Sequence, residues 1–151
     1  MEAIQSPGHT MESMCYLVNG DALFTGDTLF ISSVGRPDLN ADPEQARVRA
    51  SLLYGSVNRL LGLGGNVRVF PGHASSPPAF DGIAITERMG VVSERLCEWV
   101  ESEQAFVDRV LSHIPPTPPN FGRIVELNES GDLPPEDPTD LEAGANRCAI
   151  A

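Results

Sequence analysis

Three short runs in this chain each end in a glycine that is followed directly by a side chain able to bind a metal ion. The pairs are Gly8-His9, Gly26-Asp27 and Gly72-His73. Asp27 and His73 follow apolar segments that we expect to be strands, and His9 follows the short piece EAIQ, which we take as the end of another. Strand ends followed by tight turns are where a scaffold presents functional side chains, and glycine permits close backbone approach there.

If the three strands are neighbours in one sheet, His9, Asp27 and His73 converge at one rim. Two imidazoles and one carboxylate suit Zn(II), or Fe(II) in the two-histidine-one-carboxylate pattern. Each pair taken alone also fits an ordinary turn, with Asp27 capping the segment after it. The spacing therefore indicates a metal site and leaves the structural alternative open.

The segments around these pairs predict a chain that contains both strands and helices. Residues 14–18 form an apolar strand, and Asn19-Gly20 is a strong two-residue turn signal because both positions tolerate a positive φ. Residues 22–25 form the returning strand. Its poor polar alternation suggests burial on both faces.

A helix is expected from Asp42 to the glycines that begin at Gly62. Asp42 is a good N-cap, Pro43 suits the first helical position, and Gln45 can close a capping box. The helical spacing of its apolar residues makes one face, consisting of Leu53, Val57, Leu60 and Leu61.

The rest of the chain divides into a second strand-and-helix region and a tail. Residues 67–70 form a strand, and residues 86–97 and 102–113 are expected to be helices. We assign residues 1–114 to one domain and residues 115–151 to a tail rich in proline and acid, extended on the surface and partly ordered.

Composition excludes several classes of partner. The net charge of -11 argues against a nucleic-acid surface and against anchoring on anionic membranes, because both depend on Lys and Arg. The three cysteines, Cys15, Cys97 and Cys148, are scattered and do not resemble a disulfide framework. The N-terminal residues lack a signal-peptide pattern, and no apolar run is long enough to span a bilayer. We expect a soluble, cytoplasmic protein.

Four segments, in order, resemble the second half of the metallo-β-lactamase fold: SPGHT, LFTGDTLF, GRPDL and VFPGH. The resemblance implies an α+β fold that is part of the four-layer αβ/βα sandwich. GDTLF and the Gly-His pairs are shared with glyoxalase II-type thioesterases. SVGRPDL, SLLYGSV and the C-terminal ANRCAIA resemble the persulfide dioxygenase (sulfur dioxygenase) branch.

The resemblance implies a role for individual residues. His9, Asp27 and His73 would be the metal-binding residues, with Asp27 bridging if two metals are present and His73 either serving a second metal or lying beside a single iron. Asp27 and Tyr54 are the candidate catalytic residues. Arg36 would bind substrate, its planar fork meeting a carboxylate of glutathione or a persulfide. The alternatives are a loop salt bridge for Arg36 and a helix-face aromatic for Tyr54.

The chain departs from the family in lacking the His-x-His-x-Asp-His motif of the first half. It has only three histidines, and we interpret His113 as a residue at a helix C-terminus. The resemblance therefore implies an incomplete site and a chain that is inactive, or nearly so, alone. We expect a homo-oligomer, or a partner chain carrying the missing N-terminal half, because half a sandwich would expose an apolar sheet face.

These observations favour a fragment of a metalloenzyme that uses Fe(II) to oxidise glutathione persulfide to sulfite. One alternative is a glyoxalase II-like hydrolase that uses Zn(II) to cleave a thioester. The substrate in either case is a small-molecule thiol, persulfide or thioester. The other alternative is a metal-free, degenerate interaction module that retains the scaffold.

Overall fold

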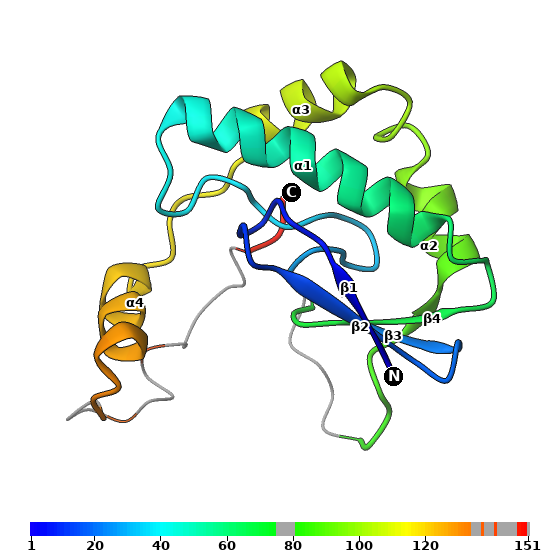
Figure 1. Cartoon of the computed structure of the whole chain (residues 1–151), viewed down its shortest axis with the longest axis horizontal. Helices are drawn as coiled ribbons and strands as arrows, with labels where there is room; N and C mark the ends of the chain where they lie inside the picture. The colour runs from blue at the N-terminus through cyan, green and yellow to red at the C-terminus, as the bar shows by residue number, and fades with distance from the viewer. Residues whose placement is uncertain (75–80, 134–136, 138–140, 142–147, 151) are drawn as a thin grey trace.

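The computed structural model describes residues 1–74, 81–133, 137, 141 and 148–150. Its sheet has five strands in the order β1-β2-β3-β4-β5, and α1 lies across one face with α3 packed on its outer side (Figure 1). The strands are β1 (Glu2–Gln5), β2 (Met14–Val18), β3 (Ala22–Gly26), β4 (Arg68–Pro71) and β5 (Glu87–Arg88). The helices are α1 (Pro43–Leu61), α2 (Met89–Leu96), α3 (Glu103–Ser112) and α4 (Phe121–Ser130).

Strand direction decides where the functional loops emerge. β1 pairs antiparallel with β2, β2 pairs antiparallel with β3, and β3 pairs parallel with β4 after the α1 crossover. β1, β3 and β4 therefore run in the same direction, and their C-terminal ends lie at one edge of the sheet. The predicted hairpin is confirmed, and Asn19 and Gly20 both have a positive φ, at 53° and 71°.

The α1 helix begins as its sequence predicts. The Asp42 carboxylate accepts from the Gln45 backbone N–H at 2.8 Å, and the Gln45 side-chain oxygen accepts from the Asp42 backbone N–H at 3.1 Å. This capping box satisfies two backbone donors at the helix N-terminus. Leu53, Val57 and Leu60 are fully buried and join the hydrophobic core between the helices and the sheet.

The structure modifies two expectations about the later residues. The helix predicted at residues 86–97 is α2, which begins at Met89 because Glu87–Arg88 pairs with β4 as β5. The tail is not simply extended, since α4 forms within it. Its partly or fully buried apolar residues recur at helical spacing, and Gly131 ends the helix in the left-handed region at φ 74°.

The last described residues are also packed rather than loose. Ile150 is 1% exposed and belongs to the same core as the strands and α1. Its backbone N–H donates to the Val34 carbonyl oxygen at 3.0 Å, and Ala149 forms an antiparallel bridge with Gly35. The C-terminus thus returns to the loop that follows β3, as Figure 1 shows. Among the described residues, no helix combines the length and the hydropathy needed to cross a bilayer.

Candidate functional site

The structure brings His9, Asp27 and His73 together at one edge of the sheet. His73 Nδ1 lies 2.6 Å from Asp27 Oδ1, and His9 Nε2 lies 3.7 Å from Asp27 Oδ2. Each side chain follows the C-terminal end of one of the three strands that share a direction, β1, β3 and β4. We expected these three strands to be neighbours in one sheet. This is confirmed for β3 and β4, but β2 lies between β1 and β3.

Close packing requires glycine at Gly8 and at Gly72, the residues that precede His9 and His73. Gly8 has a φ of 143°, and a Cβ there would lie 2.4 Å from the Leu53 Cβ, so the turn before His9 can rest directly on α1. A Cβ at Gly72 would lie 2.7 Å from Asp27 Oδ1. The couplets that contain His9 and His73 therefore have a steric cause. At Gly26 a Cβ would meet nothing within 4 Å, and the positive φ of 48° is what favours glycine there.

The orientation of the His9 ring follows from its partner. His9 Nδ1 lies 2.7 Å from the Arg36 carbonyl oxygen, which can only accept a hydrogen bond. Nδ1 therefore carries the proton, and the Nε2 of the neutral ring, facing Asp27, has a lone pair. A backbone carbonyl that fixes the tautomer in this way is a common arrangement behind a metal-binding histidine.

Asp27 is the electrostatic centre of the group. Burial raises the pKa of its carboxyl, but the hydrogen bond and charge of His73, the charge of His9 and a hydrogen bond from Cys148 outweigh it and hold the pKa below its ordinary value of 3.8. The side chain is 19% exposed. Asp27 is thus an anion at neutral pH, held in a partly desolvated position between two imidazoles.

The Arg36 side chain is buried and held by its own loop. Its Nε and Nη2 donate to the Asp38 carboxylate at 2.8 and 2.7 Å, and its Nη1 donates to the Pro116 carbonyl oxygen at 3.1 Å. This geometry favours the loop salt bridge over direct substrate contact. By orienting the backbone here, the ion pair also positions the Arg36 carbonyl that holds His9.

Tyr54 lies apart from this group, on α1. Its ring packs against Phe106 of α3 with the centroids 5.6 Å apart, and it lies against the hydrophobic core. The structure therefore favours the interpretation of Tyr54 as a helix-face aromatic. His113 is the C-cap of α3, as its sequence context predicts.

Cys148 is a member of the site that sequence reasoning missed. One donor atom each from Asp27, His73 and Cys148 lie within 4.8 Å of one another. The available signal was the short apolar end CAI after a polar stretch, which indicates that this segment packs against something. Reading the three cysteines only as scattered thiols hid it.

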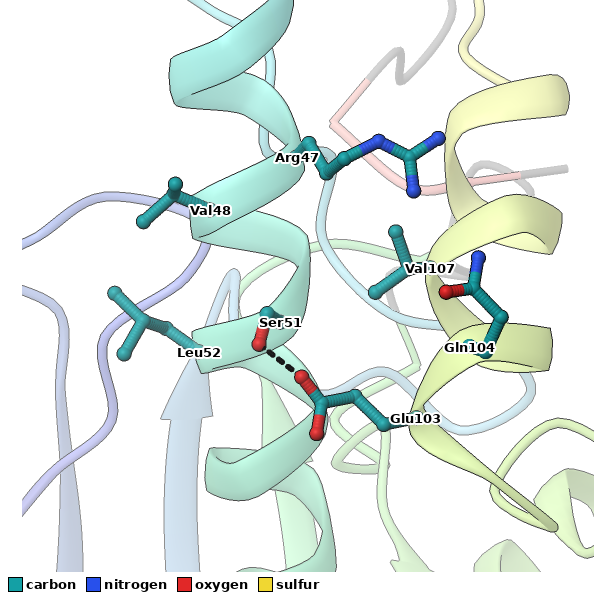
Figure 2. Close-up of a pocket in the computed structure, with 7 residues that line it drawn as sticks. All are labelled: Arg47, Val48, Ser51, Leu52, Glu103, Gln104 and Val107. Carbon is teal, nitrogen blue, oxygen red and sulfur yellow. Dashed lines mark hydrogen bonds between the residues drawn. The ribbon is translucent and has the colours of Figure 1, made fainter.

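An open cleft lies elsewhere, between α1 and α3. Figure 2 shows Ser51 of α1 donating a hydrogen bond to Glu103 of α3 across it. Arg47 and Gln104 project from opposite walls. None of the residues that line this cleft belongs to the group around Asp27. The lining consists of Arg47, Val48, Ser51, Leu52, Glu103, Gln104 and Val107.

Sequence comparison links about half of the chain to known hydrolases. No protein-family model matches. The chain is 44% identical over 70 residues to a hydroxyacylglutathione hydrolase of Shewanella halifaxensis, covering 46% of this chain and 24% of the relative. It is 37% identical over 76 residues to a probable polyketide biosynthesis zinc-dependent hydrolase of Bacillus velezensis, covering 49% of this chain and 30% of the relative. The aligned part thus spans less than a third of either relative.

Structural comparison defines the fold. A metallo-β-lactamase from Staphylococcus aureus superimposes with a TM-score of 0.72 and 24% identity, covering 90% of this chain and 42% of that one. The chain therefore has an α+β fold that is part of the metallo-β-lactamase fold. Within that fold, the resemblance to glyoxalase II-like proteins, predicted from GDTLF and the Gly-His pairs, is confirmed.

Proposed function

We propose that His9, Asp27 and His73 hold a catalytic metal ion and that the reaction is oxidation of glutathione persulfide to sulfite. The observation that carries the proposal is the position of the Asp27 carboxylate, with one oxygen toward each imidazole. Asp27 is the residue we assign to catalysis, and Arg36 supports the site through the carbonyl oxygen that holds His9.

The donor chemistry of these residues fits a divalent cation. A carboxylate that stays ionised is a competent ligand without proton loss, and in its neutral form the His9 ring presents the Nε2 lone pair on the same side. When bound, Fe(II) would supply open positions for persulfide sulfur and O₂, and Zn(II) would supply a water of lowered pKa. The choice of Fe(II) over Zn(II) is part of the proposal.

Two motifs that resemble the dioxygenase branch support persulfide as the substrate. The GRPDL loop and the C-terminal residues 148–150 are far apart in sequence, yet the Arg36 backbone N–H donates to the Cys148 carbonyl oxygen at 2.9 Å. Gly35 of the loop lies against the Asp27 backbone, and Cys148 forms a hydrogen bond with the Asp27 carboxylate. All three cysteines lie in the described part of the chain, and none is in a disulfide, which agrees with the reducing cytoplasm that we propose as its location.

Thioester hydrolysis is the second candidate. It is favoured by the similarity to proteins named hydroxyacylglutathione hydrolase and zinc-dependent hydrolase. The same three side chains would then orient a hydrolytic metal ion, and the substrate would again carry a glutathione-like group, released as a thiol on hydrolysis. The two reactions differ in their products, which makes them separable by assay.

The test measures metal content and product formation, and a substitution of His113, which lies outside the site, serves as the control. We expect the purified chain to bind iron, measured by inductively coupled plasma mass spectrometry, and Asp27→Asn to lose it while His113→Gln keeps it. Sulfite released from glutathione persulfide, faster than thiol released from a glutathione thioester, supports the dioxygenase. The reverse order of rates supports the hydrolase. A wild-type chain without bound metal contradicts both and favours the interaction module.

We also propose that a second copy or another chain contributes to the active assembly. The motivation is the apolar outer face of the sheet, where Tyr16 and Phe24 are 42% and 47% exposed. Exposed apolar surface of this kind is a common feature of protein contacts. Slow turnover by the chain alone, rising with protein concentration or on addition of the partner, is the expected result.

A further inference from the structure

We infer that Cys148 is a metal ligand, and that Asp27, His73 and Cys148 form a mixed oxygen, nitrogen and sulfur site for a thiophilic divalent cation. The inference rests on the proposed metal centre and deepens it. It adds a donor that none of the motif-based assignments contains. It also predicts that the site prefers soft and borderline ions to Mg²⁺ or Ca²⁺, because a thiolate is a soft ligand.

The backbone from Cys148 to Ile150 is held by pairing with the loop that follows β3. The Cys148 carbonyl oxygen accepts from the Arg36 N–H at 2.9 Å, and the Ile150 N–H donates to the Val34 carbonyl oxygen at 3.0 Å. The Ala149 bridge to Gly35 lies between these two hydrogen bonds. Strand-like pairing and the burial of Ile150 therefore hold Cys148 in place.

The strand partner of this segment lies directly on the site. A Cβ at Gly35 would lie 1.9 Å from the Asp27 carbonyl oxygen and 3.1 Å from the His9 Cβ. Because Gly35 is so close to Asp27, the segment paired with Gly35 is brought to the Asp27 carboxylate as well. The glycine thus permits the close approach through which Cys148 reaches the carboxylate.

The separation of the donor atoms fits one shared ion. The three donors lie within 4.8 Å of one another in the described structure. Ligands on one tetrahedral Zn²⁺ lie about 3.3 to 3.6 Å apart, given metal–ligand bonds of about 2.0 to 2.3 Å. The His73 side chain is 44% exposed and Cys148 is partly exposed, so both have room for the side-chain rotations that a shared ion requires.

The two oxygens of Asp27 divide the site into two sides. Oδ1 faces His73, which belongs to the three-donor group, and Oδ2 faces His9. Metal binding that uses Cys148 should therefore tolerate loss of His9 better than loss of His73. This asymmetry separates the inference from a site made only of the two histidines and Asp27.

The experiment is cobalt spectroscopy on the whole chain under a thiol-free reductant. We expect added Co²⁺ to produce a near-ultraviolet thiolate-to-cobalt charge-transfer band in the wild type and in His9→Gln. Cys148→Ser should lose the band, and Cys97→Ser, which removes an exposed thiol outside the site, should keep it. Far-UV circular dichroism establishes that each variant is folded.

Zinc competition gives a second, quantitative measure. Removing a residue that only hydrogen-bonds to a metal ligand already weakens metal affinity by about 10 to 100-fold. Loss of a direct ligand in Cys148→Ser should therefore weaken Zn²⁺ binding at least about tenfold. Bound Zn²⁺ should also slow alkylation of Cys148 in the wild type and leave that of Cys97 unchanged, measured by mass spectrometry.

The outcomes separate this inference from the proposed function. Cobalt bound without a thiolate band, lost in His9→Gln and retained in Cys148→Ser, overturns the role of Cys148 and leaves the histidine and aspartate centre standing. A wild-type chain that binds no cobalt overturns both. A thiolate band that persists in Cys148→Ser and disappears in Cys97→Ser assigns the metal to a different site and also overturns the inference.

Discussion

The two faces of the sheet have similar residues and opposite surroundings. On the inner face, Cys15, Leu23 and Val69 are fully buried beneath the helices. On the outer face, Tyr16 pairs across the strands with Phe24, which stacks on Phe70 with ring centroids 5.1 Å apart. Figure 1 shows α1, α2 and α3 on one side of the strands and α4 standing apart from them. Among the described residues, no helix lies over the outer face.

Strand composition alone does not reveal which face of this sheet is packed. Leu23 and Phe24 are adjacent apolar residues of β3, yet one is fully buried and the other is 47% exposed. The inner face contributes to the stability of the chain itself. The outer face, if our proposal of an assembly is right, contributes to association. Substitutions on the two faces should therefore change different measured quantities.

The largest effect is expected for Gly8→Ala, where the inner face meets the loop before His9. The backbone φ of 143° strongly disfavours a side chain, and the added Cβ would lie 2.4 Å from the Leu53 Cβ and 2.5 Å from its Cα. Backbone strain and overpacking together should lower the free energy of unfolding by about 4 kcal/mol. Urea denaturation followed by circular dichroism measures it.

Gly55→Ala is the matched control for this change, because a Cβ at Gly55 meets nothing within 4 Å. It should be neutral or raise the free energy of unfolding by up to about 1 kcal/mol, as expected for alanine in a helix. Equal effects of the two substitutions would show that the contact between Gly8 and α1 does not constrain the fold.

A somewhat smaller loss is expected for Leu53→Ala, which empties the centre of the inner core. Leu53 is fully buried, so the substitution should lower the free energy of unfolding by about 3 kcal/mol through lost burial and a residual cavity. Val48→Ala, on the same helix and 54% exposed, should change it by less than about 0.5 kcal/mol. A large effect of Val48→Ala would mean that this side of α1 is covered in solution.

The sequence predicts the part of the fold that local chemistry determines. Asn19-Gly20 requires a tight turn, and Asp42 with Gln45 requires a helix start, so these elements follow from neighbouring residues. The convergence of His9 and Asp27 could also be anticipated, because glycine couplets at strand ends signal close packing.

The position of Cys148 could not be predicted in the same way. It depends on pairing between Gly35 and Ala149, which are more than a hundred residues apart. The apolar end CAI indicates that the segment packs, but nothing in it identifies Gly35 as the partner. The α4 helix was missed because the many prolines and acids around it dominated the composition, although its apolar spacing was present. Long-range pairing is what propensity and periodicity do not report.

A smaller effect on stability and a larger one on association are expected for Phe24→Ser. Its ring stacks on Phe70 at the outer face, so the free energy of unfolding should fall by about 1 kcal/mol. Self-association, measured by sedimentation over a range of concentrations, should weaken at the same time. Leu23→Ser, the adjacent inward residue, should instead unfold the chain. Unchanged association in Phe24→Ser would contradict an interface on this face.

The smallest effect is a dependence of stability on alkaline pH that originates on the inner face. Burial raises the pKa of the Cys15 thiol above 9.0, although hydrogen bonds to Ser6 and Thr28 act in the opposite sense. The unfolded thiol ionises near pH 9.0 and the folded one above it, so between these values the unfolded state binds fewer protons. The free energy of unfolding is therefore unaffected by Cys15 below pH 9 and falls as pH rises above it, by at most about 1.4 kcal/mol per pH unit.

Comparing slopes against pH, rather than absolute stabilities, isolates this effect from the packing lost in Cys15→Ala. The variant should show a shallower decline between pH 9 and pH 10.5 than the wild type in urea denaturation. Cys97→Ala should decline as steeply as the wild type, because that thiol is exposed and lies outside the inner face. Parallel slopes for all three proteins would mean that water reaches Cys15. The inner face would then not exclude water, and its contrast with the exposed outer face would be lost.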